Sequence, residues 1–270
     1  MKFSQMLSSC WEKNDSLLCI GLDPTPAKFP EKFKTSSRPI FDFCTEIVDA
    51  TADLVCAFKP QIAYFSSSSA EQELIDIIDW IHTNHPGIPV ILDAKRGDIG
   101  STAAHYAKEV FERFKADCVT LSPYMGKDSV EPYLEYAEKG EFVLCRTSNK
   151  GGDDFQMLDV GGVPLYIKVA EKVAEWNTNG QMGLVIGATY PEELKKARAV
   201  VPDLTFLVPG IGAQGGDINA AVKAGMNKDK TGLVINSSRA ILYASKEADF
   251  AEKARAEALK TRDAINKARG

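Results

Sequence analysis

The sequence predicts an α/β protein, a (β/α)8 TIM barrel in which eight parallel strands alternate with helices and close into a ring. Short apolar runs alternate with helical patterns eight times, and nearly all of the runs end in Gly, Asp, Lys, Ser or Thr. With 270 residues and 44% hydrophobic content, the chain can bury one large core, so we predict a single domain over residues 1–270. A doubly wound parallel sheet is the alternative, but eight units without a second domain suit it less well.

The strands are placed at the apolar runs, most of which are rich in β-branched residues. These runs are residues 17–22, 54–58, 89–92, 118–121, 142–145, 183–186, 205–208 and 232–235. The helices are placed at the amphipathic segments between them, namely residues 40–52, 70–84, 102–114, 129–139, 165–177, 191–200, 218–224 and 238–243. Pro191 followed by two glutamates is typical of a helix start, which supports this spacing.

Two extra helices are predicted at the ends of the chain, over residues 1–14 and 247–270. The second has Ala254, Ala258 and Ile265 on one stripe and charged residues elsewhere, so we expect it to close the bottom or the side of the barrel. A contact between two copies of the chain is the alternative role. Two long loops, residues 23–37 and 148–163, follow strands, and long loops in compact domains are commonly functional or disordered.

Composition argues against several classes of protein. The net charge is −5 and no basic stripe is present, so a nucleic-acid partner is not expected. No apolar run approaches the length of a membrane span, and the N-terminus lacks the apolar core of a signal peptide. The six cysteines form no CxxC pair and mostly lie in apolar runs. We therefore predict a soluble, cytoplasmic protein without a membrane partner.

Charged residues gather where the third predicted strand ends. Asp93 and Lys95 are two residues apart, so on an extended backbone they project to the same side. Asp98 occupies the position expected for a helix cap, and Thr102 lies four residues further on. The simple interpretation is a βα turn with a capping Asp98 and a surface salt bridge. Arg96 is expected to be a solvated charge. The alternative is a catalytic site, because α/β folds place their chemistry at the carboxyl ends of strands.

Other strand ends add polar groups to the same face. Asp23 follows the first strand, Lys59 the second, and the segment Arg146-Thr147-Ser148-Asn149 the fifth. A glycine-rich segment containing Gln214 follows the seventh strand, and Asn236-Ser237-Ser238-Arg239 ends the eighth. Backbone amides freed by glycines, together with a guanidinium, favour phosphate binding. Two glycine-rich turns and a surface arginine are the alternative interpretation.

Other kinds of chemistry fit poorly. His82, His85 and His105 lie in or beside helices and have no metal-ligand spacing with cysteines or acids. No GxSxG elbow and no Cys/His pair at strand ends is present. We therefore expect neither a metal ion nor a cofactor.

In its motifs the chain resembles the orotidine 5′-phosphate decarboxylase family. The resemblance rests on Asp93-Ala94-Lys95-Arg96-Gly97-Asp98-Ile99 with Thr102, and it extends from about residue 17 to residue 243. Supporting blocks, in chain order, are Gly21-Leu22-Asp23, Phe58-Lys59-Pro60, the segments around Arg146 and Gln214, and the block ending in Arg239. The Gln214 block and the longer loops are similar to the branch found in many bacteria and in malaria parasites. Ser238 stands where many members have Gly, a change that leaves backbone donation intact.

The resemblance implies cofactor-free decarboxylation of orotidine 5′-monophosphate to uridine 5′-monophosphate. Asp93 would lie against the substrate carboxylate, and Lys95 would protonate C6 of the pyrimidine. Asp98 and Thr102 would reach across a two-fold axis into the partner's site, so a homodimer is implied.

The resemblance also implies the residues that hold the substrate. Asp23 and Lys59 would hold the ribose, and Ser148 with Thr147 would recognise the pyrimidine edge. The phosphate would be held by Gln214, Arg239 and the backbone amides of Ser238 and Arg239.

Two alternatives remain open at this point. A magnesium-dependent sugar-phosphate decarboxylase of the same superfamily shares the D-x-K-x-x-D motif, but it would not need the Arg146–Asn149 block or Gln214. A barrel that binds a nucleotide without catalysis is the second alternative, although the joint presence of Asp93, Lys95 and Asp98 weighs against it.

Overall fold

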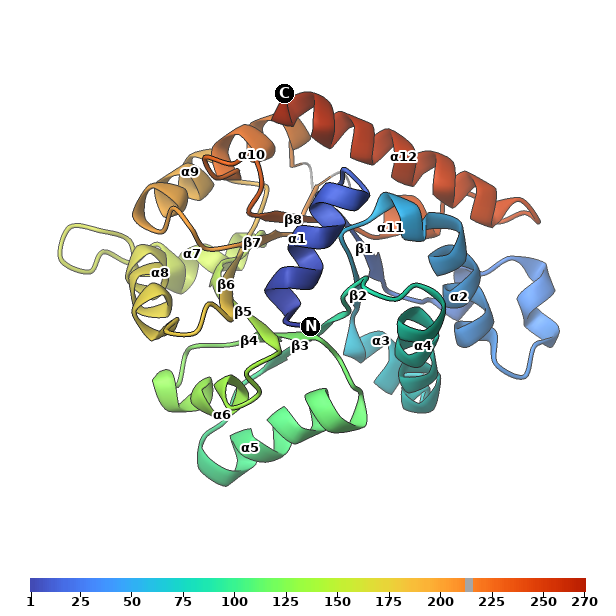
Figure 1. The fold of residues 1–270 in the computed structure, drawn as a ribbon, viewed down its shortest axis with the longest axis horizontal. Helices are drawn as coiled ribbons and strands as arrows, with labels where there is room; N and C mark the ends of the chain where they lie inside the picture. The colour runs from blue at the N-terminus through green and yellow to red at the C-terminus, as the bar shows by residue number, and fades with distance from the viewer. Residues whose placement is uncertain (212–215) are drawn as a thin grey trace.

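The structure is a computed structural model that describes residues 1–211 and 216–270. Its eight strands form one parallel sheet with the hydrogen-bonded order β2-β1-β8-β7-β6-β5-β4-β3 (Figure 1). Isolated bridges from Phe58 to Val90 and from Gln61 to Asp93 link the two ends of that order, so the barrel is nearly closed. The strands are β1 (Leu18–Leu22), β2 (Ala57–Pro60), β3 (Ile91–Arg96), β4 (Cys118–Leu121), β5 (Gly140–Arg146), β6 (Met182–Ile186), β7 (Phe206–Val208) and β8 (Leu233–Ser237).

Helices surround the strands, as the alternating pattern predicts (Figure 1). They are α1 (Phe3–Lys13), α2 (Pro39–Thr51), α3 (Ile62–Ser66), α4 (Glu71–Asn84), α5 (Gly100–Lys108), α6 (Glu131–Leu134), α7 (Asp153–Gln156), α8 (Leu165–Trp176), α9 (Pro191–Val200), α10 (Ile218–Gly225), α11 (Arg239–Leu242) and α12 (Phe250–Arg269). The predicted (β/α)8 TIM barrel is confirmed.

Several predicted elements differ from the structure. The strand expected over 54–58 begins only at Ala57, because residues 52–54 form a 3-10 turn. The helix expected over 129–139 shrinks to α6, because the chain tightens into turns beyond it, with Tyr136 N donating to Tyr133 O at 3.1 Å. The helix expected over 102–114 begins at Gly100 and changes to a π-turn at Glu109–Arg113. The third strand continues to Arg96, four residues beyond its predicted end, because a bulge keeps it paired with β4. This extension carries the charged motif.

Both predicted terminal helices are present, and the C-terminal one lies where it was predicted. Helix α1 crosses the amino-terminal end of the barrel (Figure 1), where Phe3 packs edge-to-face on Phe142 at 6.0 Å. Gly140 makes this approach possible, since a Cβ there would lie 2.1 Å from the Phe3 ring. Helix α12 packs against α2 and α10 and so covers the side of the barrel. No helix in the described ranges is both long and apolar enough to cross a membrane.

The loop over residues 23–37 is packed rather than open. It contains two short 3-10 helices, Pro26–Lys28 and Glu31–Thr35. Phe29 and Phe33 are buried, and Phe29 stacks on Phe43 of α2 with 4.1 Å between ring centroids. An aromatic cluster therefore fixes this loop next to the end of β1.

Candidate active site

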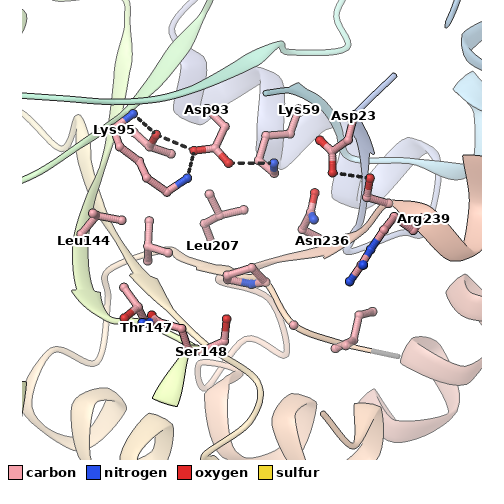
Figure 2. Close-up of a pocket in the computed structure, with 17 residues that line it drawn as sticks. Asp23, Lys59, Asp93, Lys95, Leu144, Thr147, Ser148, Leu207, Asn236 and Arg239 are labelled. Atoms are coloured by element: carbon pink, nitrogen blue, oxygen red, sulfur yellow. Dashed lines mark hydrogen bonds and ion pairs between the residues drawn. The ribbon is translucent and has the colours of Figure 1, made fainter. Parts of the chain in front are cut away.

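A cavity of about 310 Å³ opens at the carboxyl ends of the strands. Acidic and basic groups line one side of it, and Thr147 and Ser148 lie on the opposite side in the view of Figure 2. This is the end of the barrel where the sequence predicted the site. The predicted site residues that line the cavity are Asp23, Lys59, Asp93, Lys95, Thr147, Ser148, Ser238 and Arg239.

The centre of the site is a row of alternating charges, Lys95–Asp93–Lys59 (Figure 2). Lys95 Nζ donates to Asp93 Oδ1 at 2.7 Å, and Lys59 Nζ donates to Asp93 Oδ2 at 3.1 Å. The two ammonium groups differ in access, because the Lys59 side chain is 5% exposed and that of Lys95 is 48% exposed. Of the two lysines, Lys95 is therefore the more accessible to a molecule in the cavity.

The row keeps its charges despite burial. Burial opposes ionisation of Asp93, but Lys59 and Lys95 outweigh it and hold the pKa of that carboxyl well below its usual range. Burial likewise favours the neutral amine of Lys59, yet Asp93 and Asp23 raise its pKa above the ordinary value. The site therefore presents an ionised carboxylate between two ammonium groups.

The far end of the cavity is built by β1 and β8. Ser238 Oγ donates to Asp23 Oδ2 at 2.6 Å, and the exposed Arg239 lies nearby (Figure 2). Gly21 allows β8 to approach, since a Cβ on it would meet Ser238 Cβ at 2.9 Å. Asp23 Oδ1 and Asn236 Oδ1 are buried without a hydrogen-bond partner among the described residues. Acceptors left open in this way are suited to hydroxyl donors of a ligand.

Arg146 does not line the cavity but anchors the loop that follows β5. Its side chain is 1% exposed and pairs with Asp153 of α7 at 2.6 Å and with Glu193 of α9. Gln156 of α7 accepts from Thr147 N at 2.8 Å and donates to Thr147 Oγ1 at 2.9 Å. The loop over 148–163 is thus fastened at its start, and this holds Thr147 and Ser148 at the cavity.

Two predicted residues lie away from the cavity within this chain. Asp98 is half-buried and its Oδ1 accepts from Ile99 N at 2.8 Å, while Thr102 is exposed on α5. The prediction that Asp98 caps the helix was wrong, since the helix starts at Gly100 and its N-cap is Ile99. The expectation of a solvated Arg96 was also wrong, because this residue pairs with Glu109 at 2.8 Å. Gln214 lies outside the described residues.

Sequence reasoning missed Thr120 and gave Asn236 no role as an individual residue, although both line the cavity. Thr120 lies inside the apolar run of β4 rather than after it, so a search of strand ends passes over it. A hydroxyl in a run that is otherwise apolar is the signal that could have indicated it. In residues 1–211 and 216–270, no three His, Cys, Asp or Glu side chains gather into a metal-ligand group.

Comparison with known proteins agrees with this geometry. The family described as orotidine 5′-phosphate decarboxylase / HUMPS matches residues 16–254. The chain belongs to this family. It is 65% identical over 270 residues to the orotidine 5′-phosphate decarboxylase of Cupriavidus metallidurans, covering 100% of this chain and 99% of that protein. It is 62% identical to that of Ralstonia pickettii, with both chains covered completely.

The fold has solved relatives as well. The structure of Leishmania donovani OMP decarboxylase superposes with a TM-score of 0.87 at 40% sequence identity, covering 100% of this chain and 99% of that one. The family match and this similarity confirm the resemblance that the sequence motifs predicted.

Proposed function

We propose that the protein catalyses the decarboxylation of orotidine 5′-monophosphate to uridine 5′-monophosphate. The observation that carries the proposal is the half-exposed Lys95 ammonium, held 2.7 Å from a buried, ionised Asp93 at the wall of the cavity. Relatives that match over the full chain and carry this enzyme's name support it.

The substrate is proposed to lie along the cavity with its phosphate at the β8 end. Arg239 and the backbone amides of Ser238 and Arg239 supply donors for the phosphate oxygens. Asp23 and Lys59 then hold the ribose hydroxyls, and the open Asp23 Oδ1 is a ready acceptor. Thr147 and Ser148 receive the pyrimidine edge on the opposite side. A contribution from Gln214 to the phosphate site belongs to the same proposal.

The chemical step needs a cation where negative charge develops. The bond from C6 to the carboxylate breaks, its electron pair stays on C6, and carbon dioxide leaves. A proton from Lys95 Nζ then forms the new C6–H bond, and solvent reprotonates the amine. An ammonium at roughly 4 Å from the developing carbanion, at an effective dielectric near 20, contributes about 4 kcal/mol. Because Asp93 fixes Lys95 before the reaction, little reorganisation is required.

We also propose that the active unit is a homodimer in which Asp98 and Thr102 enter the partner's site. Apolar side chains around them support an interface, since Ile99 is 50%, Met125 49% and Tyr124 86% exposed. Tyr124 lies 6.5 Å from the ring of Phe155, which is also exposed, so the apolar surface continues onto α7. Exposed apolar surface of this kind is typical of a protein interface.

The first experiment follows the ultraviolet absorbance of orotidine 5′-monophosphate with purified protein, with and without EDTA. We expect the orotate chromophore to be lost at the same rate in both, and Lys95→Ala to slow the loss by about 10³-fold. Lys115→Ala is the matched control, because that lysine pairs with Asp79 on the surface. Failure of folded protein to turn over this substrate would refute the proposal. Magnesium-dependent turnover of a sugar phosphate would favour the first alternative.

The dimer is tested by mixing two inactive variants, Lys95→Ala and Asp98→Ala. If each site takes Lys95 from one chain and Asp98 from the other, mixed dimers contain one intact site, and after subunit exchange about a quarter of all sites are intact. Recovered activity near that fraction supports the shared site. If both residues serve the site of their own chain, mixing restores nothing. The cytoplasmic location stays a prediction based on cysteine usage.

A further inference from the structure

Thr120 of β4 makes three hydrogen bonds from one buried hydroxyl. The residue is 1% exposed. Oγ1 accepts from the backbone N–H groups of Ala94 at 3.0 Å and Lys95 at 2.9 Å, and it donates to Asp93 Oδ1 at 2.9 Å. A hydroxyl has one donor and two acceptor lone pairs, so this one is fully used. Every partner is a residue of the charged motif on β3.

The hydroxyl fills a gap in the pairing of β3 with β4. Leu92 pairs with Val119 and Arg96 with Leu121, so residues 93–95 stand opposite Thr120 alone. Such a bulge removes strand partners from the extra amides and re-aims the side chains. Here the Thr120 side chain accepts from two of these amides in place of a strand carbonyl. Without it, both would need another acceptor.

Lys95 itself has a backbone conformation that needs such support. Its φ is +45°, in the left-handed region that residues other than glycine rarely adopt. A residue is held there only when its surroundings determine the conformation. The bond from Lys95 N to Thr120 ties the strained residue directly to β4, and the bond from Thr120 to Asp93 fixes the carboxylate that receives Lys95 Nζ (Figure 2).

We propose that Thr120 is a positioning residue that sets the geometry of Lys95 and Asp93 for proton delivery; this proposal rests on the decarboxylase function proposed above. One hydroxyl forms hydrogen bonds both with the backbone of Lys95 and with the side chain of Asp93. Packing does not explain it, because a valine has the same shape but lacks the hydroxyl that makes all three hydrogen bonds. The hydroxyl is what the site requires.

The test compares Thr120→Val, which keeps the shape and removes the hydroxyl, with Thr120→Ser, which keeps the hydroxyl. We expect Thr120→Val to lower kcat on orotidine 5′-monophosphate by about 10²-fold, the size of effect that a misplacement near 1 Å produces. Binding of uridine 5′-monophosphate, measured by calorimetry, should change less than about threefold, because the proposed phosphate contacts at Arg239 and the proposed ribose contact at Asp23 do not involve the bulge. Thr120→Ser should retain kcat within about fivefold of the unaltered protein.

Several results would overturn the proposal. Unchanged kcat in Thr120→Val would do so, as would Thr120→Ser failing as badly as Thr120→Val, since shape would then be the requirement. A parallel loss of product binding and kcat would indicate general damage to the site. If Thr120→Val does not fold, Thr120→Ala takes its place with the same expectations. Inactivity of the unaltered protein refutes the decarboxylase function itself, so the two failures are distinguishable.

Discussion

Two buried carboxylates on strands of the same sheet have pKa values shifted in opposite directions. Asp93, at the carboxyl end of β3, is faced by two lysines, and its pKa lies well below the ordinary value. Glu141, near the amino-terminal end of β5, has both oxygens buried and unpartnered among the described residues. Burial alone raises the pKa of Glu141 to about 8.

The difference shows that burial does not decide the charge of an acid in this barrel. Both groups lose contact with water, and the presence or absence of charged partners determines the outcome. At the carboxyl ends of the strands, Lys59 and Lys95 keep Asp93 ionised. At the amino-terminal end, Glu141 has no partner among the described residues, and its raised pKa favours the neutral acid. Removing a lysine from Asp93 should therefore raise the pKa of Asp93, and placing a cation beside Glu141 should lower the pKa of Glu141.

Among the tests of this comparison, the largest effect is expected from Lys59→Met, which removes one of the two ammonium groups that face Asp93. In the unaltered protein the pKa of Asp93 is so low that the group stays ionised in mildly acidic buffer. Protonation of Asp93 should therefore cost no activity there. In the variant Lys95 alone opposes the effect of burial, so the pKa of Asp93 should rise into the measurable range and an acid limb should enter the profile of kcat/KM. We expect a loss of about 10²-fold at neutral pH, with Lys115→Met as control. A variant with an unchanged profile would show that Lys59 does not set the charge of Asp93.

Glu141→Gln should change stability without changing kcat. The unfolded chain loses this proton near the ordinary pKa of 4.5, whereas the folded chain keeps it until about pH 8. Stability of the unaltered protein therefore falls between these values, by about 1.4 kcal/mol for each pH unit. The glutamine variant lacks this loss, so its relative stability should rise from pH 5 to pH 8 and then level off.

Urea unfolding at several pH values between 5 and 9 measures this difference. Glu138→Gln is the matched control, because its carboxylate is exposed at the same end of the barrel. Burying glutamine has a desolvation cost that does not depend on pH. The decisive quantity is therefore the slope, against pH, of the difference in free energy of unfolding between the two proteins. Parallel curves for the two proteins would mean that Glu141 is ionised in the folded state.

A smaller effect is expected at Asp117, a third buried carboxylate, which is partnered by a histidine rather than by two lysines. Burial opposes its ionisation, but a hydrogen bond from His82 at 2.8 Å helps to lower its pKa. Val90 N also donates to it at 2.9 Å. His82→Leu should reduce the free energy of unfolding by about 1–2 kcal/mol at pH 7. His85→Leu, which breaks a pair with the exposed Asp49, should cost less, and equal losses would contradict the ranking.

Much of the barrel could be predicted from sequence because strand runs and their polar ends repeat with a strong pattern. Asp93, Lys95 and Lys59 could be assigned to one site because parallel strands share one catalytic edge. The bulge could not be predicted, since it depends on the pairing of residues 93–95 with Thr120 on a strand that is distant in sequence. The internal role of Arg146 was equally hidden, because its partners lie on α7 and α9 and no local spacing connects them.

The buried position of Arg146 also divides the loop after β5 into two parts with different freedom to vary. Asp153 and Gln156 bind the guanidinium and Gln156 also binds Thr147, so an insertion between residues 147 and 156 would displace Thr147. Residues 157–163 lie beyond the last of these contacts, and several of them are exposed. Changes in loop length among relatives should therefore concentrate in this outer part. A tag or a fluorescent label placed there should leave the wall of the cavity intact.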